Sequence, residues 1–141
     1  NTLEALGSGR MSDITMEGNV EVSLPKTLTD RVEDYAYGVG GIVGYQGTAT
    51  AEHTSIVRNC TSRESITGYG YNTGGISGSI TSYGDSFIEN CQSYGDVSSS
   101  LHQVGGIVGY IVSKGETAVD GCIAYGQAAI ARARLAQTAS R

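Results

Sequence analysis

Hydrophobic residues in this chain occur in short runs bounded by glycine, serine and asparagine, and within each run they alternate with polar residues. Two such runs are GGIVG at residues 40–44 and SFIENC at residues 86–91. Alternation with a period of two predicts short β-strands. A 3.6-residue apolar stripe is missing, and glycine costs a helix interior about 1 kcal/mol per residue, so helices are not expected in these segments.

The pattern of short runs repeats along the chain. The string GVGGIVGY at residues 38–45 returns as QVGGIVGY at residues 103–110, with NTGGISGS at residues 72–79 between them. The three cysteines are 31 residues apart, and aligning on them matches SIVRNC, SFIENC and TAVDGC. Equal spacing of matching segments predicts a solenoid in which each copy forms one coil.

Strands that repeat in register without a hairpin signature stack as parallel coils. We therefore predict an all-β, parallel β-helix-like solenoid of about three full coils and one partial coil, with ~31 residues in each coil. Two columns of side chains should point inward, one from each half of the repeat. These columns are Ile42, Ile76 and Ile107, and Cys60, Cys91 and Cys122.

The spacing also predicts how the chain is organised. Residues 1–13 are expected to be an N-terminal lead-in or cap, and residues 14–129 to be the solenoid, with an inserted loop at residues 24–38. Residues 130–141 are expected to be a C-terminal cap or a tail foreign to the native chain. The first full copy carries three extra residues within residues 46–54.

A partial copy precedes the first full one. It aligns best with Met16 at the cysteine position and Val20 at the position of Val97. The chain also begins at Asn1, as if cut from a larger protein.

Composition and charge narrow the possible functions. The 21 glycines follow no three-residue period and there is one proline, which excludes a collagen helix. A net charge of −5 argues against a nucleic-acid partner, because binding to phosphates needs a basic surface. No run of 18 apolar residues exists, so membrane insertion is not expected. The glycine strings also lack the lysine of a phosphate-binding loop, and we expect no cofactor.

The repeat units resemble the GLUG motif, which is named for a Gly-Leu-hydrophobic-Gly string. The corresponding strings here are Gly41-Ile42-Val43-Gly44, Gly75-Ile76-Ser77-Gly78 and Gly106-Ile107-Val108-Gly109, with the companion half NCQSYGDV at residues 90–97. Such repeats belong to large secreted or surface proteins of bacteria, including adhesins and the non-catalytic regions of immunoglobulin A-specific metallopeptidases. The resemblance implies an extracellular scaffold or adhesive array on the bacterial surface.

The three cysteines allow two interpretations. Zinc sites favour closely paired cysteines or added histidines, and neither pattern occurs, so no metal site is expected. A column of reduced, buried cysteines is the first interpretation. A single disulfide between adjacent coils is the second, although parallel side-chain directions give it poor geometry.

Three further columns are candidates for surface chemistry. Arg58, Glu89 and Asp120 share one column, where the two acids are either a catalytic pair acting on polysaccharide or a solvated ladder. Tyrosines occupy the other columns. Aromatic side chains beside arginine can bind sugar rings or protein side chains. The predicted ligand-binding residues are Tyr94, Tyr125, Arg63, Tyr45 and Tyr110.

The sequence thus predicts a non-catalytic structural and adhesive module of a large bacterial surface or secreted protein. Its expected partners are neighbouring repeats of the parent chain and a host glycan or extracellular protein. The alternatives are a fragment of a polysaccharide-acting β-helix enzyme and a passive stalk of a surface peptidase.

Overall fold

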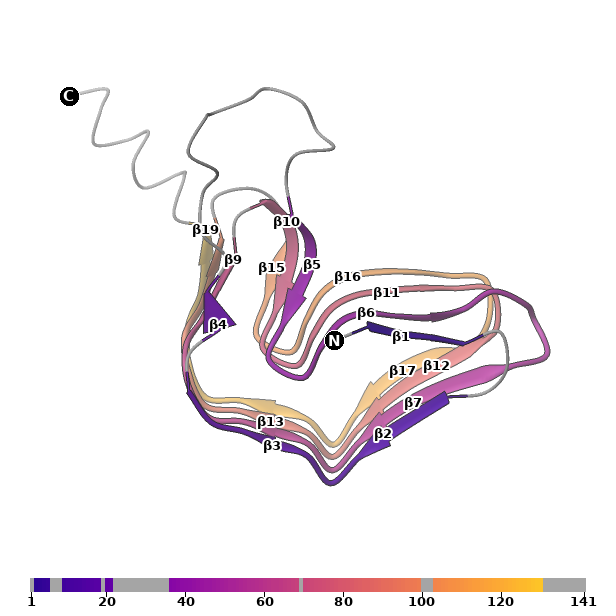
Figure 1. The fold of residues 1–141 in the computed structure, drawn as a ribbon, viewed down its shortest axis with the longest axis horizontal. Helices are drawn as coiled ribbons and strands as arrows, with labels where there is room; N and C mark the ends of the chain where they lie inside the picture. Colours follow the sequence, from indigo (N-terminus) through magenta and orange to yellow (C-terminus); the bar gives the residue numbers. More distant parts are fainter. Residues whose placement is uncertain are drawn as a thin grey trace.

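The computed structural model describes residues 2–5, 9–18, 20–21, 36–68, 70–99 and 103–130. These residues form β-strands, turns and bends, with no helix in the described ranges and thus none that could span a membrane. Each pass of the chain contributes one strand to each of several sheets, and every described strand pair is parallel. The predicted all-β, parallel solenoid is confirmed (Figure 1).

Five parallel sheets run along the solenoid, and each is named below by the strand from residues 36–68. The β6 sheet contains β1 (Thr2–Ala5), β6 (Val43–Thr48), β11 (Ser77–Ser82) and β16 (Val108–Ser113). The β7 sheet contains β2 (Gly9–Ser12), β7 (Thr54–Arg58), β12 (Asp85–Glu89) and β17 (Thr117–Asp120).

The other three sheets are built from shorter strands. The β8 sheet contains β3 (Thr15–Met16), β8 (Thr61–Ser62), β13 (Gln92–Ser93) and β18 (Ile123–Ala124). The β9 sheet contains β4 (Val20–Glu21), β9 (Ile66–Gly68), β14 (Val97–Ser99) and β19 (Ala128–Ile130). The β5 sheet contains β5 (Ala36–Gly40), β10 (Gly70–Gly74) and β15 (Val104–Gly105).

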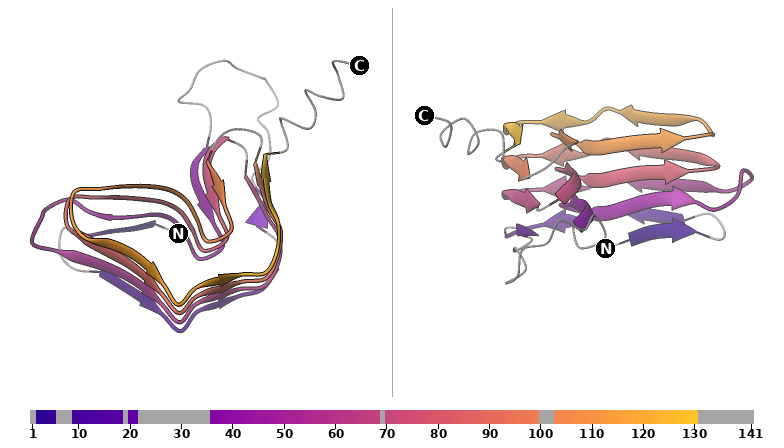
Figure 2. Two further views of the ribbon diagram at one scale, coloured as in Figure 1. Left: turned by 180° about the vertical axis from the view of Figure 1, so that it is seen from behind. Right: turned by 90° about the horizontal axis from the view of Figure 1, so that it is seen from above.

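The coils stack in the register that the sequence spacing predicts. Ser86 of β12 pairs with Ser55 on one side and with Thr117 on the other, which are its equivalents 31 residues away. Figure 2 shows the passes of the chain lying one above another, seen from behind and from above. The 31-residue spacing is therefore one turn of the solenoid.

Most residues in the left-handed backbone region fall into two columns, one at the corner between the β7 and β8 sheets and one within or next to the strands of the β5 sheet. One column has φ between 51° and 65° and comprises Asp13, Asn59, Asn90 and Gly121. The other has φ between 59° and 83° and comprises Gly38, Asn72 and Gln103, which are the first residues of the three glycine strings. Asparagine, aspartate and glycine tolerate this conformation better than most residues. The replacement of asparagine by Gly121 in the last described coil therefore preserves the corner.

The second glycine of each Gly-Gly pair marks a narrow waist inside the coil. A Cβ on Gly41 would lie 2.7 Å from the Cβ of Ser62, and a Cβ on Gly75 would lie 2.7 Å from the Cβ of Ser93. Because neither side can carry a large side chain, the turn between β5 and β6 approaches the β8 sheet closely. The same pairing of a glycine with a small residue recurs in each coil of residues 36–130.

The waist separates two apolar clusters in the interior. The larger cluster comprises Ile42, Val43, Val57, Cys60, Ile76, Ile80, Ile88 and Cys91. The smaller one comprises Val39, Ile66 and Val97. Both predicted inward columns are confirmed, since Ile42, Ile76, Cys60 and Cys91 are buried. Ile107 and Cys122 pack against the larger cluster.

The first pass of the chain differs from the expected organisation. Thr2–Ala5 and Gly9–Ser12, expected in a lead-in or cap, form β1 and β2, which pair with β6 and β7. The alignment of Met16 with the cysteines is wrong by two residues. Thr61 N donates to the carbonyl of Ile14 as Gln92 N donates to that of Cys60, so Ile14 occupies the cysteine position.

The remaining boundaries depend on segments at the edges of the described ranges. Residues 36–38, expected at the end of the inserted loop 24–38, belong to β5. Residues 22–35 and 131–141 lie outside the described residues. The three extra residues of the first full copy form part of the turn at residues 49–53, where the next coil has only residues 83–84 between its strands.

Candidate functional site

The predicted tyrosine column on the β8 sheet forms a stacked ladder. The ring centroids of Tyr94 and Tyr125 are 4.7 Å apart and their planes differ by 6°. Arg63 Cζ lies 5.7 Å from the centroid of Tyr94, and the hydroxyl of Tyr94 donates to Gln92 Oε1 at 2.9 Å. Tyr94 is 41% exposed and Tyr125 is 57% exposed, so the ladder borders solvent.

Stacking decides which parts of these rings can meet a ligand. Arg63 and Tyr125 lie in adjacent coils on opposite sides of Tyr94, so both faces of the Tyr94 ring are covered. The ring presents its edge to solvent, while the outer face of Tyr125 has no further aromatic ring over it among the described residues. The ladder is therefore suited to edge contacts and hydrogen bonds along the solenoid, together with one stacking contact at Tyr125.

The other predicted tyrosines lie on a different sheet. Tyr45 of β6 and Tyr110 of β16 flank Ser79 of β11, as the sequence predicted. The Tyr45 hydroxyl donates to the carbonyl oxygen of Thr81 at 3.3 Å, which holds the ring across the neighbouring coil. The structure therefore divides the five predicted residues into two surfaces, one on the β8 sheet and one on the β6 sheet.

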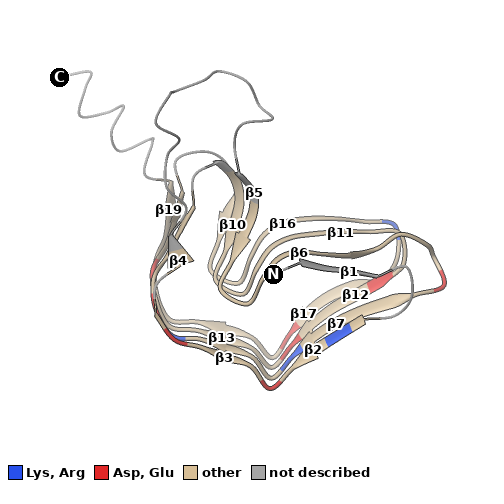
Figure 3. Ribbon diagram, viewed as in Figure 1, with Lys and Arg blue, Asp and Glu red and all other residues tan. Residues whose placement is uncertain are grey.

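The predicted acidic column lies at the end of the β7 sheet. Arg58, Glu89 and Asp120 are register neighbours. Figure 3 shows basic and acidic segments close together at the corner where the β7 strands end. Arg58 Nε and Nη2 both contact Glu89 Oε2 at 2.7 Å, and both side chains are about a third exposed. The Glu89 carboxylate is thus held in an ion pair at the end of the β7 sheet.

The cysteine column is made of free thiols. Cys60 and Cys91 donate from Sγ to the carbonyl oxygens of Arg58 and Glu89 at 3.2 and 3.3 Å. Burial raises the pKa of Cys91 to about 12, and burial also raises the pKa of Cys122. Because the thiolate is the reactive form, these cysteines act as small hydrophobic residues, as the first interpretation had it.

One pocket was missed by the sequence analysis. It opens over the β6 sheet, has a volume of about 280 Å³, and is lined in part by Tyr45, Tyr83, Val112 and Lys114. Tyr83 and Lys114 follow β11 and β16 at equivalent positions and so share one column. Ala49 occupies the same position in the preceding coil. An alignment of the residues that follow the glycine strings would have placed Ala49, Tyr83 and Lys114 in one column.

No group of three or more His, Cys, Asp or Glu side chains in the described part of the chain is arranged to hold a metal ion.

The stacked parallel coils define a repeat protein of the β-solenoid class. Within it, residues 35–67 match the family model described as the GLUG motif. This match covers close to one coil, from β5 to β9, and the equivalent strands of residues 70–130 repeat the same arrangement. The chain therefore contains a GLUG-motif repeat region. No curated protein and no solved structure matches the chain.

Proposed function

We propose that this chain is a non-catalytic structural and adhesive repeat module of a large bacterial surface or secreted protein, and that it works outside the cell. The GLUG motif supports a repeat module of a larger protein. The observation that carries the adhesive part is the exposed ladder of Arg63, Tyr94 and Tyr125. Tyrosine and arginine are the residues that binding surfaces favour, because they offer large contact areas with few rotatable bonds.

The geometry of the ladder suits an extended partner. Each coil places one more ring or guanidinium along the axis, with 4.7 Å between the two tyrosine rings. A host glycan or an extended segment of an extracellular protein could contact successive coils, and weak contacts at each coil would add up. Neighbouring repeats of the parent chain are its other partners, since they would continue the same columns.

The proposal that the module is non-catalytic rests on the column of Arg58, Glu89 and Asp120. Acids that catalyse glycoside hydrolysis need one carboxyl to give or take a proton beside a bound sugar. Here Arg58 holds Glu89 through two contacts on an open corner. We expect no glycan turnover by the chain and no change in the Glu89→Gln or Asp120→Asn variants. Turnover that these substitutions abolish would support the polysaccharide-acting enzyme instead.

Binding of the purified chain to a glycan array and to a panel of extracellular-matrix and mucosal proteins tests the proposal. We expect saturable binding that weakens when Tyr94 and Tyr125 are both replaced by alanine. Tyr71→Ala is the matched control, because Tyr71 is a partly exposed tyrosine of β10 and lies outside both candidate surfaces. If a folded chain shows no binding to the glycan array or to the protein panel, the result would contradict adhesion and favour the passive stalk.

A further inference from the structure

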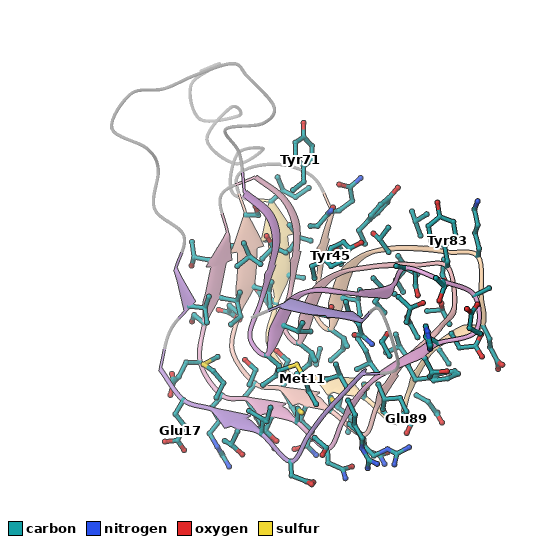
Figure 4. All side chains as sticks on the ribbon, turned by 45° about the vertical axis from the view of Figure 1, so that its right-hand side comes forward. Met11, Glu17, Tyr45, Tyr71, Tyr83 and Glu89 are labelled. Atoms are coloured by element: carbon teal, nitrogen blue, oxygen red, sulfur yellow. The ribbon has the colours of Figure 1, made fainter. Side chains whose placement is uncertain are left out.

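The pocket over the β6 sheet is formed by outward-facing side chains of successive coils. Along the strands, Tyr45 stands at one end and Tyr83 with Lys114 at the other, and Thr81 and Val112 lie between them. Figure 4 shows Tyr45 and Tyr83 spaced along this face. Because the middle residues are smaller than the tyrosines, the face is hollowed between two aromatic walls.

A break in the repeat creates the hollow. The β6–β11 pairing ends at Gln46 and Ile80, whereas the β11–β16 pairing continues for two more residues. Gly47 stands where the pairing ends, and a Cβ there would overlap the carbonyl oxygen of Thr81. The first coil therefore adds no side chain beside Thr81, which leaves that side of the hollow open.

Buried hydroxyls fix the base of the pocket where the strand pairing stops. Thr48 N donates to Ser82 Oγ at 3.0 Å, and Gly84 N donates to Thr48 Oγ1 at 2.8 Å. The backbone of Tyr83 is held as well, because its N–H donates to the carbonyl oxygen of Thr48 at 3.1 Å. These bonds position the wall residue before any ligand arrives, which lowers the entropic cost of binding.

Lys114 gives the pocket its charge. Its Nζ lies 4.8 Å from the ring centroid of Tyr83, within the range of a cation–π contact. It makes no ion pair with any residue that the structure describes. The nearby carboxylate of Asp85 accepts a hydrogen bond from Glu116 N at 2.8 Å, so it is engaged with the backbone of the next coil. The ammonium group is thus oriented at the pocket edge and available to an anion.

We propose that this pocket binds one carboxylated sugar ring of an acidic glycan, with the carboxylate at Lys114 and the ring between Tyr45 and Tyr83. A volume of about 280 Å³ admits a single ring rather than a long chain. A sugar has apolar C–H faces for the aromatic walls and hydroxyls for the tyrosine oxygens. The inference rests on the proposed adhesive function and names the ligand class of a second surface.

Titration of the ¹⁵N-labelled full chain with glucuronate, N-acetylneuraminate and glucose, followed by NMR, tests the proposal. We expect shifts at residues 81–83 and 112–114 and a Kd on the order of 1 mM for the better acid. Glucuronate should bind about two- to fivefold more tightly than glucose, which has the same ring without the carboxylate. The ratio of glucuronate to N-acetylneuraminate binding distinguishes the two sources of acidic sugar.

Variants separate the roles of charge and ring. Lys114→Gln should remove the preference for glucuronate and leave glucose binding unchanged, and Lys114→Arg should keep the preference. Tyr83→Ala should weaken both sugars about two- to tenfold. Tyr71→Ala, a partly exposed tyrosine of β10 outside both proposed binding surfaces, is the matched control and should change neither. High salt should reduce the preference, since screening shortens the reach of exposed charges.

Two results would overturn the pocket proposal. One is the absence of shifts at these residues up to about 50 mM sugar, and the other is an unchanged preference in Lys114→Gln. If the arrays still show binding that depends on Tyr94 and Tyr125, the adhesive function stands and only the pocket fails. If the pocket binds the acids while the arrays stay silent, the pocket stands and adhesion through the tyrosine ladder fails.

Discussion

The waist of the solenoid can be tested by exchanging the sizes of two residues. A Cβ on Gly106 would lie 2.6 Å from the Cβ of Ala124, whereas carbon atoms in contact prefer about 3.5–4.0 Å. Gly106→Ala should therefore overpack the waist. Ala124→Gly removes the opposing methyl group, so the double variant should accommodate the new side chain.

The structure sets the expected magnitudes. Overpacking a tight contact costs about 1–3 kcal/mol, which is the expected loss for Gly106→Ala. Ala124→Gly should cost about 0.5–1 kcal/mol, mainly through the greater freedom of glycine in the unfolded chain. Because the clash is absent from the double variant, it should be no less stable than Ala124→Gly alone. The coupling between the two sites should then be about 1–3 kcal/mol.

Urea unfolding of the four proteins, followed by far-UV circular dichroism, measures this cycle. The pair Gly75 and Ser93 is the control, because a Cβ on Gly75 would also overlap the backbone carbonyl oxygen of Gly106. Ser93→Gly should therefore fail to rescue Gly75→Ala. A neutral Gly106→Ala, or additive effects of Gly106→Ala and Ala124→Gly, would refute the reasoning that contact between these side chains sets the waist.

Three further predictions follow from buried groups and corners. Ser93→Ala should be neutral or stabilising by up to about 1 kcal/mol in urea unfolding, because the buried Ser93 Oγ has no hydrogen-bond partner among the described residues. Asn90→Ala should cost about 1–2 kcal/mol at a φ of 51°, whereas Asn90→Gly should be nearly neutral; thermal melting distinguishes them. Burial raises the pKa of Cys91 from 9.0 to about 12, so above pH 9 the unfolded thiol ionises first. The free energy of unfolding should then fall by up to about 1.4 kcal/mol per pH unit, and less steeply in Cys91→Ala.

Much of the fold could be predicted because a solenoid converts sequence spacing directly into neighbours. The equal spacing of the cysteines placed Cys60 beside Cys91, and the same step placed Glu89 beside Asp120. Where the repeat is weak, the alignment had no such support. The resemblance of residues 14–23 to residues 88–98 aligns Met16 with the cysteines, whereas the backbone places Ile14 there.

The shape of each coil could not be predicted from the repeat spacing. A repeat fixes what lies above and below a residue, but it does not say which sheets face each other across the interior. The waist depends on Gly41 meeting Ser62, two residues from different halves of the unit. Their small size was visible in the sequence, yet their contact was not, because it arises from the left-handed corners that turn the chain.

The candidate site shows the same division. The column of Arg63, Tyr94 and Tyr125 was predicted, but its stacking depends on side-chain rotamers that column membership does not set. Tyr83 and Lys114 were missed because they lie just beyond the glycine strings, where the first copy carries extra residues. An alignment of the copies singles out residues that match in every copy, and Tyr83 and Lys114 do not match each other.

The contrast between matching and differing columns indicates where specificity resides. The matching columns of glycine, small residues and left-handed corners are needed in each coil, because stacking fails without them. Columns whose residues differ between coils include Arg58, Glu89 and Asp120, and Arg63, Tyr94 and Tyr125, and these face solvent at least in part. Each coil can therefore change its outward residues without disturbing the ladder. If the proposed adhesive function holds, each added coil would lengthen these outward columns and increase affinity for an extended ligand, with no change in the fold of any single coil.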